Sequence, residues 1–332
     1  MRARGGLYAG AGRSGNEPAS SLAAAGPGRH PAAVPAADKP AAEVSVDERL
    51  VRALLRDQFP ELAALDLVEL EAGWDNFIFR LGDELVVRLP RRALAAGLVA
   101  HEQQWLPVLA PRLPLAIPAP VGAGRPGRGY PWSWSVCPWF HGAPAHVAPV
   151  ADPKDAAAQL GGFIAALHVD APPDAPPNPF RGGPLAPRDD VVRERAASLS
   201  DVVDDVAVVD RWAALSATPP WDRPPVWLHG DLHPGNVLVT DGRISAVIDF
   251  GDITAGDPAT DLAVAWMLLP ETARLTLRRA AGDVDDHTWS RAQGWALMFG
   301  LMFAASSAGD SAYTAFGVTV VEQVLADTVP GA

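Results

Sequence analysis

Apolar and polar residues alternate along several short runs in the part of the chain that follows residue 45. Alternation with a period of two is typical of strands that bury one face. Four such runs are expected to form strands: 67–71, 76–81, 84–89 and 132–137. Helical spacing instead marks residues 46–58 and 94–109. Because Gly82-Asp83 separates two of the runs, we expect a tight hairpin there, within a small antiparallel sheet that carries one main helix.

The pattern becomes mainly helical beyond residue 139. Helices are expected over 154–168, over 188–216 and through most of the chain after residue 258. A proline-rich loop over 171–187 and a short hairpin over 237–248 interrupt them. The predicted class is α+β and bilobal, with a small antiparallel β-sheet lobe and a larger, mainly helical lobe.

The same pattern predicts how the chain divides. Residues 1–42 are rich in Ala, Gly and Pro and hold few large apolar side chains, so they bury too little surface to offset the entropy of ordering. We expect a disordered, low-complexity tail there. The change of pattern near 138–144 predicts an N-terminal lobe over 43–138 and a C-terminal lobe over 139–332.

Composition narrows the class of protein. The 332 residues include a single cysteine, Cys137, which excludes an intramolecular disulfide and a cysteine-based zinc cluster and fits a reducing cytoplasm. The net charge of −12 argues against a nucleic-acid partner, which would need a basic surface. No membrane association is expected, because the longest apolar run, 295–306, is shorter than the ~20 residues of a membrane span. We read this run as a buried helix in which Gly300 allows close packing.

The polar loop HGDLHPGN, residues 229–236, carries the candidate chemistry. It follows an apolar run, and the hairpin after it ends in Asp249 of the sequence IDFGD. Phosphoryl transfer needs a carboxylate that orients the attacking hydroxyl, a role that suits Asp231. It also needs oxygen ligands for Mg²⁺, and Asn236 and Asp249 suit that role. We therefore expect these three side chains at the ends of neighbouring strands.

HGDLHPGN followed by IDFGD resembles the aminoglycoside phosphotransferase family of the protein-kinase-like fold. The kinase pattern places an Asn five residues after the catalytic Asp, and an Asp-Phe-Gly thirteen residues further, as Asp231, Asn236 and Asp249 do here. The resemblance covers roughly residues 45–325. It implies transfer of phosphate from ATP, with GTP as the alternative, to a hydroxyl group of a small molecule, with Mg²⁺ as cofactor. It also implies that residues 43–138 bind the nucleotide and that 139–332 carry the catalytic and acceptor sites.

Other roles for the acidic and histidine residues remain open. HGDLH also contains the H-x-D-x-H pattern of a metal hydrolase, although His229 and His233 are expected to shape the loop. Asp257 is expected to be the N-cap of a helix that begins at Pro258. Asp261 is expected to be structural, and the resemblance implies that such acidic residues brace the catalytic loop.

A second candidate site lies upstream. Glu102 falls on the apolar stripe predicted for 94–109, together with Leu98, Trp105 and Leu109, and a buried carboxylate needs a partner. Arg88 is the nearest sensible one. Kinases hold the α- and β-phosphates with a strand cation paired to a helix glutamate, but the cation is usually Lys. A purely structural ion pair is the alternative.

Three further residues are candidates for the nucleotide side. Gly73 and Asn76 lie where kinases carry a glycine-rich loop, and a simple turn is the alternative. Cys137 lies where the family places the hinge between its lobes, so it either lines the adenine pocket or only packs beneath it.

The sequence features that could indicate the acceptor substrate are weaker than those of the catalytic segment. Asp201 and Asp205 are expected on one helix face, which could hold a cationic substrate such as an aminoglycoside or could be a solvated surface. Trp139, Trp212 and Trp221 are candidates to stack on an acceptor ring, although most of the tryptophans are expected in the core. A metabolic kinase for a sugar, an amino alcohol or a homoserine-like compound, and a catalytically inactive nucleotide-binding protein, are the alternative functions. Either a monomer or a homodimer is expected.

Overall fold

The computed structural model describes residues 41–70, 73–306 and 311–327. The predicted tail over 1–42 therefore lies almost wholly outside the described residues, as does the end of the predicted strand 67–71.

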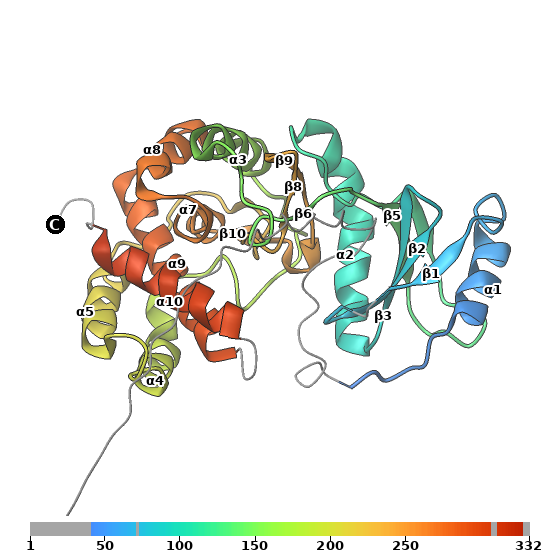
Figure 1. Ribbon diagram of the computed structural model, residues 1–332, viewed down its shortest axis with the longest axis horizontal. Helices are drawn as coiled ribbons and strands as arrows, with labels where there is room; N and C mark the ends of the chain where they lie inside the picture. The colour runs from blue at the N-terminus through green and yellow to red at the C-terminus, as the bar shows by residue number, and fades with distance from the viewer. Residues whose placement is uncertain (1–40, 71–72, 307–310, 328–332) are drawn as a thin grey trace, which may run out of the picture. The chain divides into compact units, whose positions relative to one another are not determined.

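An antiparallel sheet of five strands forms the N-terminal part (Figure 1). Its strands are β1 (Leu67–Glu69), β2 (Asn76–Leu81), β3 (Leu85–Pro90), β4 (Gly122–Gly124) and β5 (Trp134–Pro138), in the order β1-β2-β3-β5-β4. Gly82 has a φ of 57° in the turn between β2 and β3, which fits the predicted hairpin. Strand β4 has no counterpart in the predicted pattern, because Gly-Ala-Gly offers no alternation of large side chains.

Two helices accompany this sheet. Helix α1 (Glu48–Gln58) begins after Asp47, whose carboxylate accepts the Leu50 N–H at 2.8 Å, and its buried leucines join the core of the sheet. Helix α2 (Ala93–Leu109) buries Glu102, and its last turns join the larger core of the C-terminal part. The predicted stripe of α2 is partly wrong, because Leu98 and Trp105 are only half-buried.

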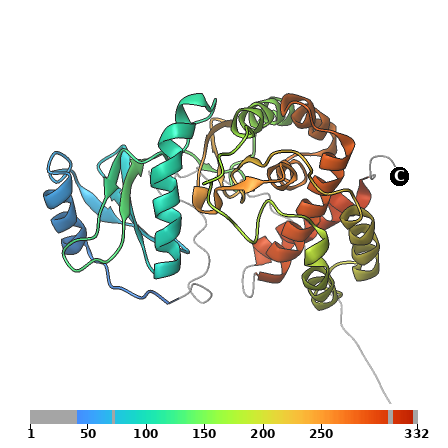
Figure 2. The same cartoon turned by 180° about the vertical axis from the view of Figure 1, so that it is seen from behind.

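The C-terminal part is mainly helical. Its helices are α3 (Pro153–Leu167), α4 (Asp189–Ser198), α5 (Asp205–Ser216), α6 (Ala259–Leu262), α7 (Val264–Leu268), α8 (Glu271–Ala280), α9 (Asp286–Ser306) and α10 (Ser311–Ala326). Two small sheets lie among them (Figure 2). One pairs β6 (Ala143–Pro144), β8 (Val237–Thr240) and β9 (Arg243–Val247), and the other pairs β7 (Val226–Leu228) with β10 (Thr254–Gly256). The predicted α+β class is confirmed.

Helices α9 and α10 approach each other closely at Gly300 and Gly317. A Cβ atom on Gly317 would lie 2.3 Å from the backbone nitrogen of Ala304 and 2.5 Å from the carbonyl oxygen of Gly300. The prediction that 295–306 is a buried helix with a close contact at Gly300 is confirmed. Among the described helices, none is long and apolar enough to cross a bilayer.

One expectation for the C-terminal part is wrong, and the structure resolves the roles of Trp212 and Asp257. Asp201 does not share a helix face with Asp205, because Asp204 caps α5 by accepting the Ala207 N–H and the chain before it forms a turn. Trp212 is fully buried and donates its indole N–H to Asp189, so it packs in the core. The helix α6 has Pro258 at its N-cap position, one residue later than expected, but Asp257 makes the predicted capping contact, because its Oδ1 accepts the Ala259 N–H at 3.0 Å.

Candidate active site

A buried aspartate holds the backbone at the start of the loop that follows β7. Asp261, which is fully buried, accepts the backbone N–H of His229 at 2.8 Å and that of Gly230 at 2.9 Å. Its third contact is the His168 ring, at 3.0 Å. Burial would raise the pKa of Asp261, but its contacts with His168, His229 and Gly230 outweigh burial and lower it. Asp261 thus stays charged and holds the backbone at the start of the loop.

The two histidines of the loop organise it, as expected. His229 binds the carbonyl oxygen of Ile248 through Nε2, at 2.9 Å, and accepts the Asp231 N–H through Nδ1, at 3.1 Å. His233 accepts the Gly235 N–H through Nδ1, and its Nε2 faces Asp231. Within the described ranges, no group of three or more His, Cys, Asp or Glu residues is arranged to hold a metal ion, so the hydrolase alternative has no support there.

Asp231 lies at the centre of this loop, with its carboxylate held on two sides. Oδ1 accepts from Arg181 at 3.1 Å, and Oδ2 lies 3.4 Å from Nε2 of His233. Burial alone would raise the pKa of Asp231, but His233, Arg181 and His229 outweigh burial and hold it well below its usual range. The group is therefore a carboxylate at neutral pH.

Asn236 directly precedes β8 and Asp249 follows β9, so both lie at the same end of the hairpin. The Ile248 N–H donates to the Asn236 carbonyl at 2.9 Å, which brings Asp249 beside Asn236. The amide nitrogen of Asn236 donates to the Asp231 carbonyl at 2.9 Å, so Oδ1 of Asn236 points away from that contact. The Asp249 side chain is 61% exposed, and its backbone has a left-handed φ of 64°. One amide oxygen and one open carboxylate form a hard-oxygen donor pair that fits Mg²⁺.

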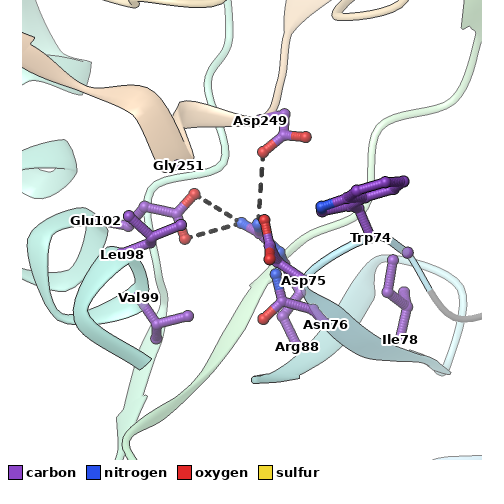
Figure 3. A pocket seen from close by; sticks show the side chains of 11 residues that line it. Trp74, Asp75, Asn76, Ile78, Arg88, Leu98, Val99, Glu102, Asp249 and Gly251 are labelled. Carbon is purple, nitrogen blue, oxygen red and sulfur yellow. Dashed lines mark hydrogen bonds and ion pairs between the residues drawn. The ribbon is translucent and has the colours of Figure 1, made fainter. Parts of the chain in front are cut away.

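Arg88 and Glu102 form the ion pair that the sequence predicts. One guanidinium nitrogen of Arg88, Nη1, lies 3.0 Å from each carboxylate oxygen of Glu102, and the other, Nη2, lies 4.0 Å from Asp249 (Figure 3). Burial raises the pKa of Glu102, and Arg88 opposes this rise. Burial would lower the pKa of Arg88, but Glu102, Cys137 and Asp249 raise it above its usual value. Arg88 therefore stays charged, with one nitrogen turned toward the site.

Arg88, Glu102 and Asp249 line one pocket with a volume of about 90 Å³. Its lining includes five predicted site residues: Gly73, Asn76, Arg88, Glu102 and Asp249. Asp231 and Asn236 are not part of the lining. The pocket is smaller than the ~300 Å³ of a small ligand site, so it fits a phosphate group and not a whole nucleotide.

The turn over residues 73–76 lines this pocket, and its shape does not require a glycine-rich sequence. Gly73 donates its N–H to the Asn76 carbonyl at 2.9 Å, and its φ lies outside the left-handed region, so a tight turn forms without a glycine-rich loop. Asp75 in the same turn pairs with Arg92 at 2.7 Å. Oδ1 of Asn76 is buried and has no hydrogen-bond partner among the described residues. A polar ligand in the pocket would satisfy it.

Two residues of the site carry no clear signal in the sequence. Arg181 lies in the proline-rich loop between α3 and α4, far from any motif, and Trp74 flanks the pocket beside Gly73.

Cys137 is buried and pairs with Val86 across the sheet, outside the residues that line the pocket. Trp139 lies under Arg80, with the guanidinium 4.1 Å from the ring centre.

A second and larger cavity, of about 590 Å³, adjoins the catalytic loop. It lies among the loop residues His233 and Gly235, α7 and α10. Its larger side chains are mainly apolar or aromatic: His146, Val147, His233, Met267, Leu268, Tyr313 and Phe316. None of the described lining residues carries a carboxylate. Its volume falls within the range of sites for small molecules.

Comparison with known proteins agrees with this geometry. A model of the phosphotransferase enzyme family matches residues 66–295. The fold is similar to that of aminoglycoside 2'-phosphotransferase-IIIa in its GDP complex, with a TM-score of 0.62, 21% identity, and coverage of 85% of this chain and 99% of that chain. It is also similar to a macrolide 2'-phosphotransferase from Brachybacterium faecium, with a TM-score of 0.54, 24% identity, and coverage of 82% and 97%.

A third similar structure is the ADP-bound aminoglycoside phosphotransferase APH(2'')-Ib, with a TM-score of 0.54, 16% identity, and coverage of 84% of this chain and 99% of that chain. No curated protein gives a significant match. The family model covers more than half of the sequence. The chain belongs to the phosphotransferase enzyme family and is a kinase-type phosphotransferase with the protein-kinase-like fold.

Proposed function

We propose that this protein transfers the γ-phosphate of ATP, or of GTP, to a hydroxyl group of a small molecule. The observation that carries the proposal is the meeting of Arg88, Glu102 and Asp249 at one phosphate-sized pocket. Asp249 in turn adjoins the loop that holds Asp231 and Asn236. This set is complete, which argues against an inactive nucleotide-binding protein.

The proposed reaction assigns one proton transfer to Asp231. The acceptor oxygen forms a bond to the γ-phosphorus while the bond from that phosphorus to the β–γ bridging oxygen breaks, and the nucleoside diphosphate leaves. The hydroxyl proton passes to Oδ2 of Asp231, because Oδ1 is held by Arg181 and Oδ2 has only long contacts, at 3.4 and 3.5 Å. A carboxylate with a low pKa is a weak base, so its main contribution is to orient the hydroxyl.

The other residues bind and neutralise charge. Asn236 and Asp249 would hold Mg²⁺, which neutralises charge on the phosphates when bound. Arg88 would bind a phosphate oxygen through Nη2 while Nη1 remains on Glu102. Asn76 would accept a hydrogen bond from a donor group of the ligand through its buried Oδ1, with Gly73 in the same turn. Similar structures contain GDP or ADP, which supports nucleotide binding.

We assign the acceptor to the larger cavity beside His233. Its apolar and aromatic lining favours a bulky, largely apolar compound that bears a hydroxyl group, such as a macrolide, over a polycation such as an aminoglycoside. Similar structures include both macrolide and aminoglycoside phosphotransferases. A metabolic kinase for a small sugar or amino alcohol is the weaker candidate, because such compounds would leave most of the cavity unfilled.

We also propose a division into a nucleotide-binding lobe over 43–138 and a catalytic, acceptor-binding lobe over 139–332. Two separate hydrophobic cores support it, although Leu106 and Leu109 of α2 belong to the larger core. A cytoplasmic location, and a role in antibiotic resistance, follow from the proposed reaction.

A screen tests this function. The full chain with Mg·ATP is incubated with macrolides, kanamycin, gentamicin, sugars and amino alcohols, and release of ADP is measured with and without each acceptor. We expect stimulation by macrolides. Phe316→Asp, in the cavity, should raise the acceptor KM at least ~10-fold while the KM for ATP stays unchanged, and Thr319→Asp, exposed on the same helix, should change neither. Stimulation by aminoglycosides alone would overturn the acceptor assignment, and no stimulation by any compound would count against the reaction itself.

A further inference from the structure

Arg181 approaches the catalytic loop from a segment that has no catalytic motif. Its Nη2 donates to Oδ1 of Asp231 at 3.1 Å and lies 3.9 Å from Oδ2 of Asp252. The guanidinium also stacks on Phe299, with 5.0 Å between its carbon and the ring centre. Only 13% of the side chain is exposed, and Nε is buried with no hydrogen-bond partner among the described residues. A long side chain held on two sides in this way has lost most of its rotamer freedom.

The backbone around Arg181 is fixed on both sides. Before it, Asn178 donates its amide to Asp252 at 2.7 Å and accepts the Phe180 N–H at 2.9 Å. After it, Gly182 donates to Thr260 and accepts the Asp257 N–H at 2.9 Å. Gly182 has a φ of 69°, and a Cβ atom there would lie 2.9 Å from Leu228, so the close approach requires glycine. Hydrogen bonds therefore attach this loop to residues 252–260, the segment that follows β9.

We propose that Arg181 is a positioning residue that fixes the Asp231 carboxylate so that Oδ2 faces the acceptor hydroxyl. This inference deepens the proposed function and rests on it. The contact of Arg181 with Oδ1 selects one rotamer of Asp231 and leaves Oδ2 with its long contacts to His233 and Asn236. A positioned base gains rate because the reacting atoms are already aligned. Arg181 acts through Asp231, so its contribution must vanish when Asp231 cannot act.

The test uses the full chain and the slow hydrolysis of Mg·ATP, with water as the acceptor and phosphate release as the readout. Arg181→Met should lower kcat by roughly 10- to 100-fold and leave the KM for ATP within ~3-fold of wild type. Arg181→Lys should recover part of kcat. In an Asp231→Asn background, Arg181→Met should have no further effect. Arg188→Met is the matched control, because Arg188 also stacks on an aromatic ring, 4.6 Å from the centre of Trp295, and no contact among the described residues joins it to Asp231.

Several outcomes would overturn the proposal. A wild-type kcat in Arg181→Met, or the same fall in kcat with and without Asp231→Asn, would show that Arg181 does not act through Asp231. If Arg181→Met fails to fold, a kcat of Arg181→Lys equal to that of a folded Asp231→Asn variant would contradict the expected partial recovery. If wild-type protein neither binds nor hydrolyses Mg·ATP, the proposed function itself fails. A double-mutant cycle on chemical denaturation then still tests the pair, and a coupling of zero between Arg181 and Asp231 would overturn the positioning role.

Discussion

Arg88 places a single nitrogen, Nη1, 3.0 Å from both carboxylate oxygens of Glu102, which leaves Nη2 directed toward Asp249. A lysine has one nitrogen and could not occupy both positions at once. Arginine therefore suits a site in which one end of the cation is fixed by the protein and the other is offered to a phosphate. We therefore expect Arg88 to take the phosphate-binding role that kinases usually give to a lysine.

Breaking this pair should separate stability from nucleotide binding. Arg88→Met leaves Glu102 buried and unpaired, so we expect a loss of roughly 3 kcal/mol in the free energy of unfolding and a large loss of ATP affinity. Arg88→Met combined with Glu102→Leu should recover most of the stability but none of the ATP affinity. Urea denaturation and nucleotide titration measure the two effects. Recovery of ATP binding in the double variant would contradict the phosphate-binding role of Arg88.

The buried Asp261 should make stability depend on pH. Its pKa is lowered in the folded protein, so its contribution is fully present above the unfolded value of about 3.9 and is lost as the pH falls through the folded pKa. We expect Asp261→Asn to be less stable than wild type at pH 7 and the difference between them to shrink toward pH 3. Thermal midpoints across this range provide the measurement. A constant difference at all pH values would be inconsistent with a charged Asp261.

Cys137 should be inert in the native protein. It is fully buried, and burial raises the pKa of its thiol to about 12, although Arg88 opposes the rise. Since the thiolate is the reactive form, iodoacetamide at pH 8 should label Cys137 only after denaturation. Mass spectrometry of native and urea-treated samples checks this, and rapid labelling of the native protein would show that the strand is open at Cys137.

The contact between α9 and α10 should tolerate no side chain. A methyl group on Gly317 would meet backbone atoms of α9, so Gly317→Ala should lower stability by roughly 1–3 kcal/mol. Gly97→Ala, on α2, is the matched control, because nothing lies within 4 Å of a Cβ atom there. Denaturant midpoints compare the two variants, and equal stability would place α10 elsewhere.

The sequence predicts that Asp231, Asn236 and Asp249 lie close together because they belong to one short segment, and their catalytic roles stay predictions. Asp231 lies in the loop before β8, Asn236 directly precedes β8 and Asp249 follows β9, so one loop and the hairpin after it hold all three. The pair of Arg88 and Glu102 could also be inferred, because a buried carboxylate on an apolar helix face needs a cation. Arg181 could not, because its role arises from the anchoring of a proline-rich loop by Asn178 and Gly182. Hydrogen bonds between segments so far apart leave no periodic signal.

The acidic residues of the C-terminal part show a second reason why residue spacing does not predict every part of the structure. Helical spacing alone would place Asp201 and Asp205 on one face, but Asp204 accepts the Ala207 N–H and starts α5 between them. The larger cavity is lined by residues from segments far apart in the sequence, so the sequence pattern does not predict its apolar character either. A capping bond or a shared cavity depends on tertiary context that spacing does not contain.

The central claim is that Asp231 orients the acceptor for phosphoryl transfer, and one variant tests it directly. Asp231→Asn keeps the size of the side chain and removes its charge. We expect its rate of phosphate transfer from Mg·ATP to fall by ~10²-fold or more, while thermal stabilisation by Mg·ATP is retained. Undiminished transfer by Asp231→Asn, with nucleotide binding intact, would contradict the account.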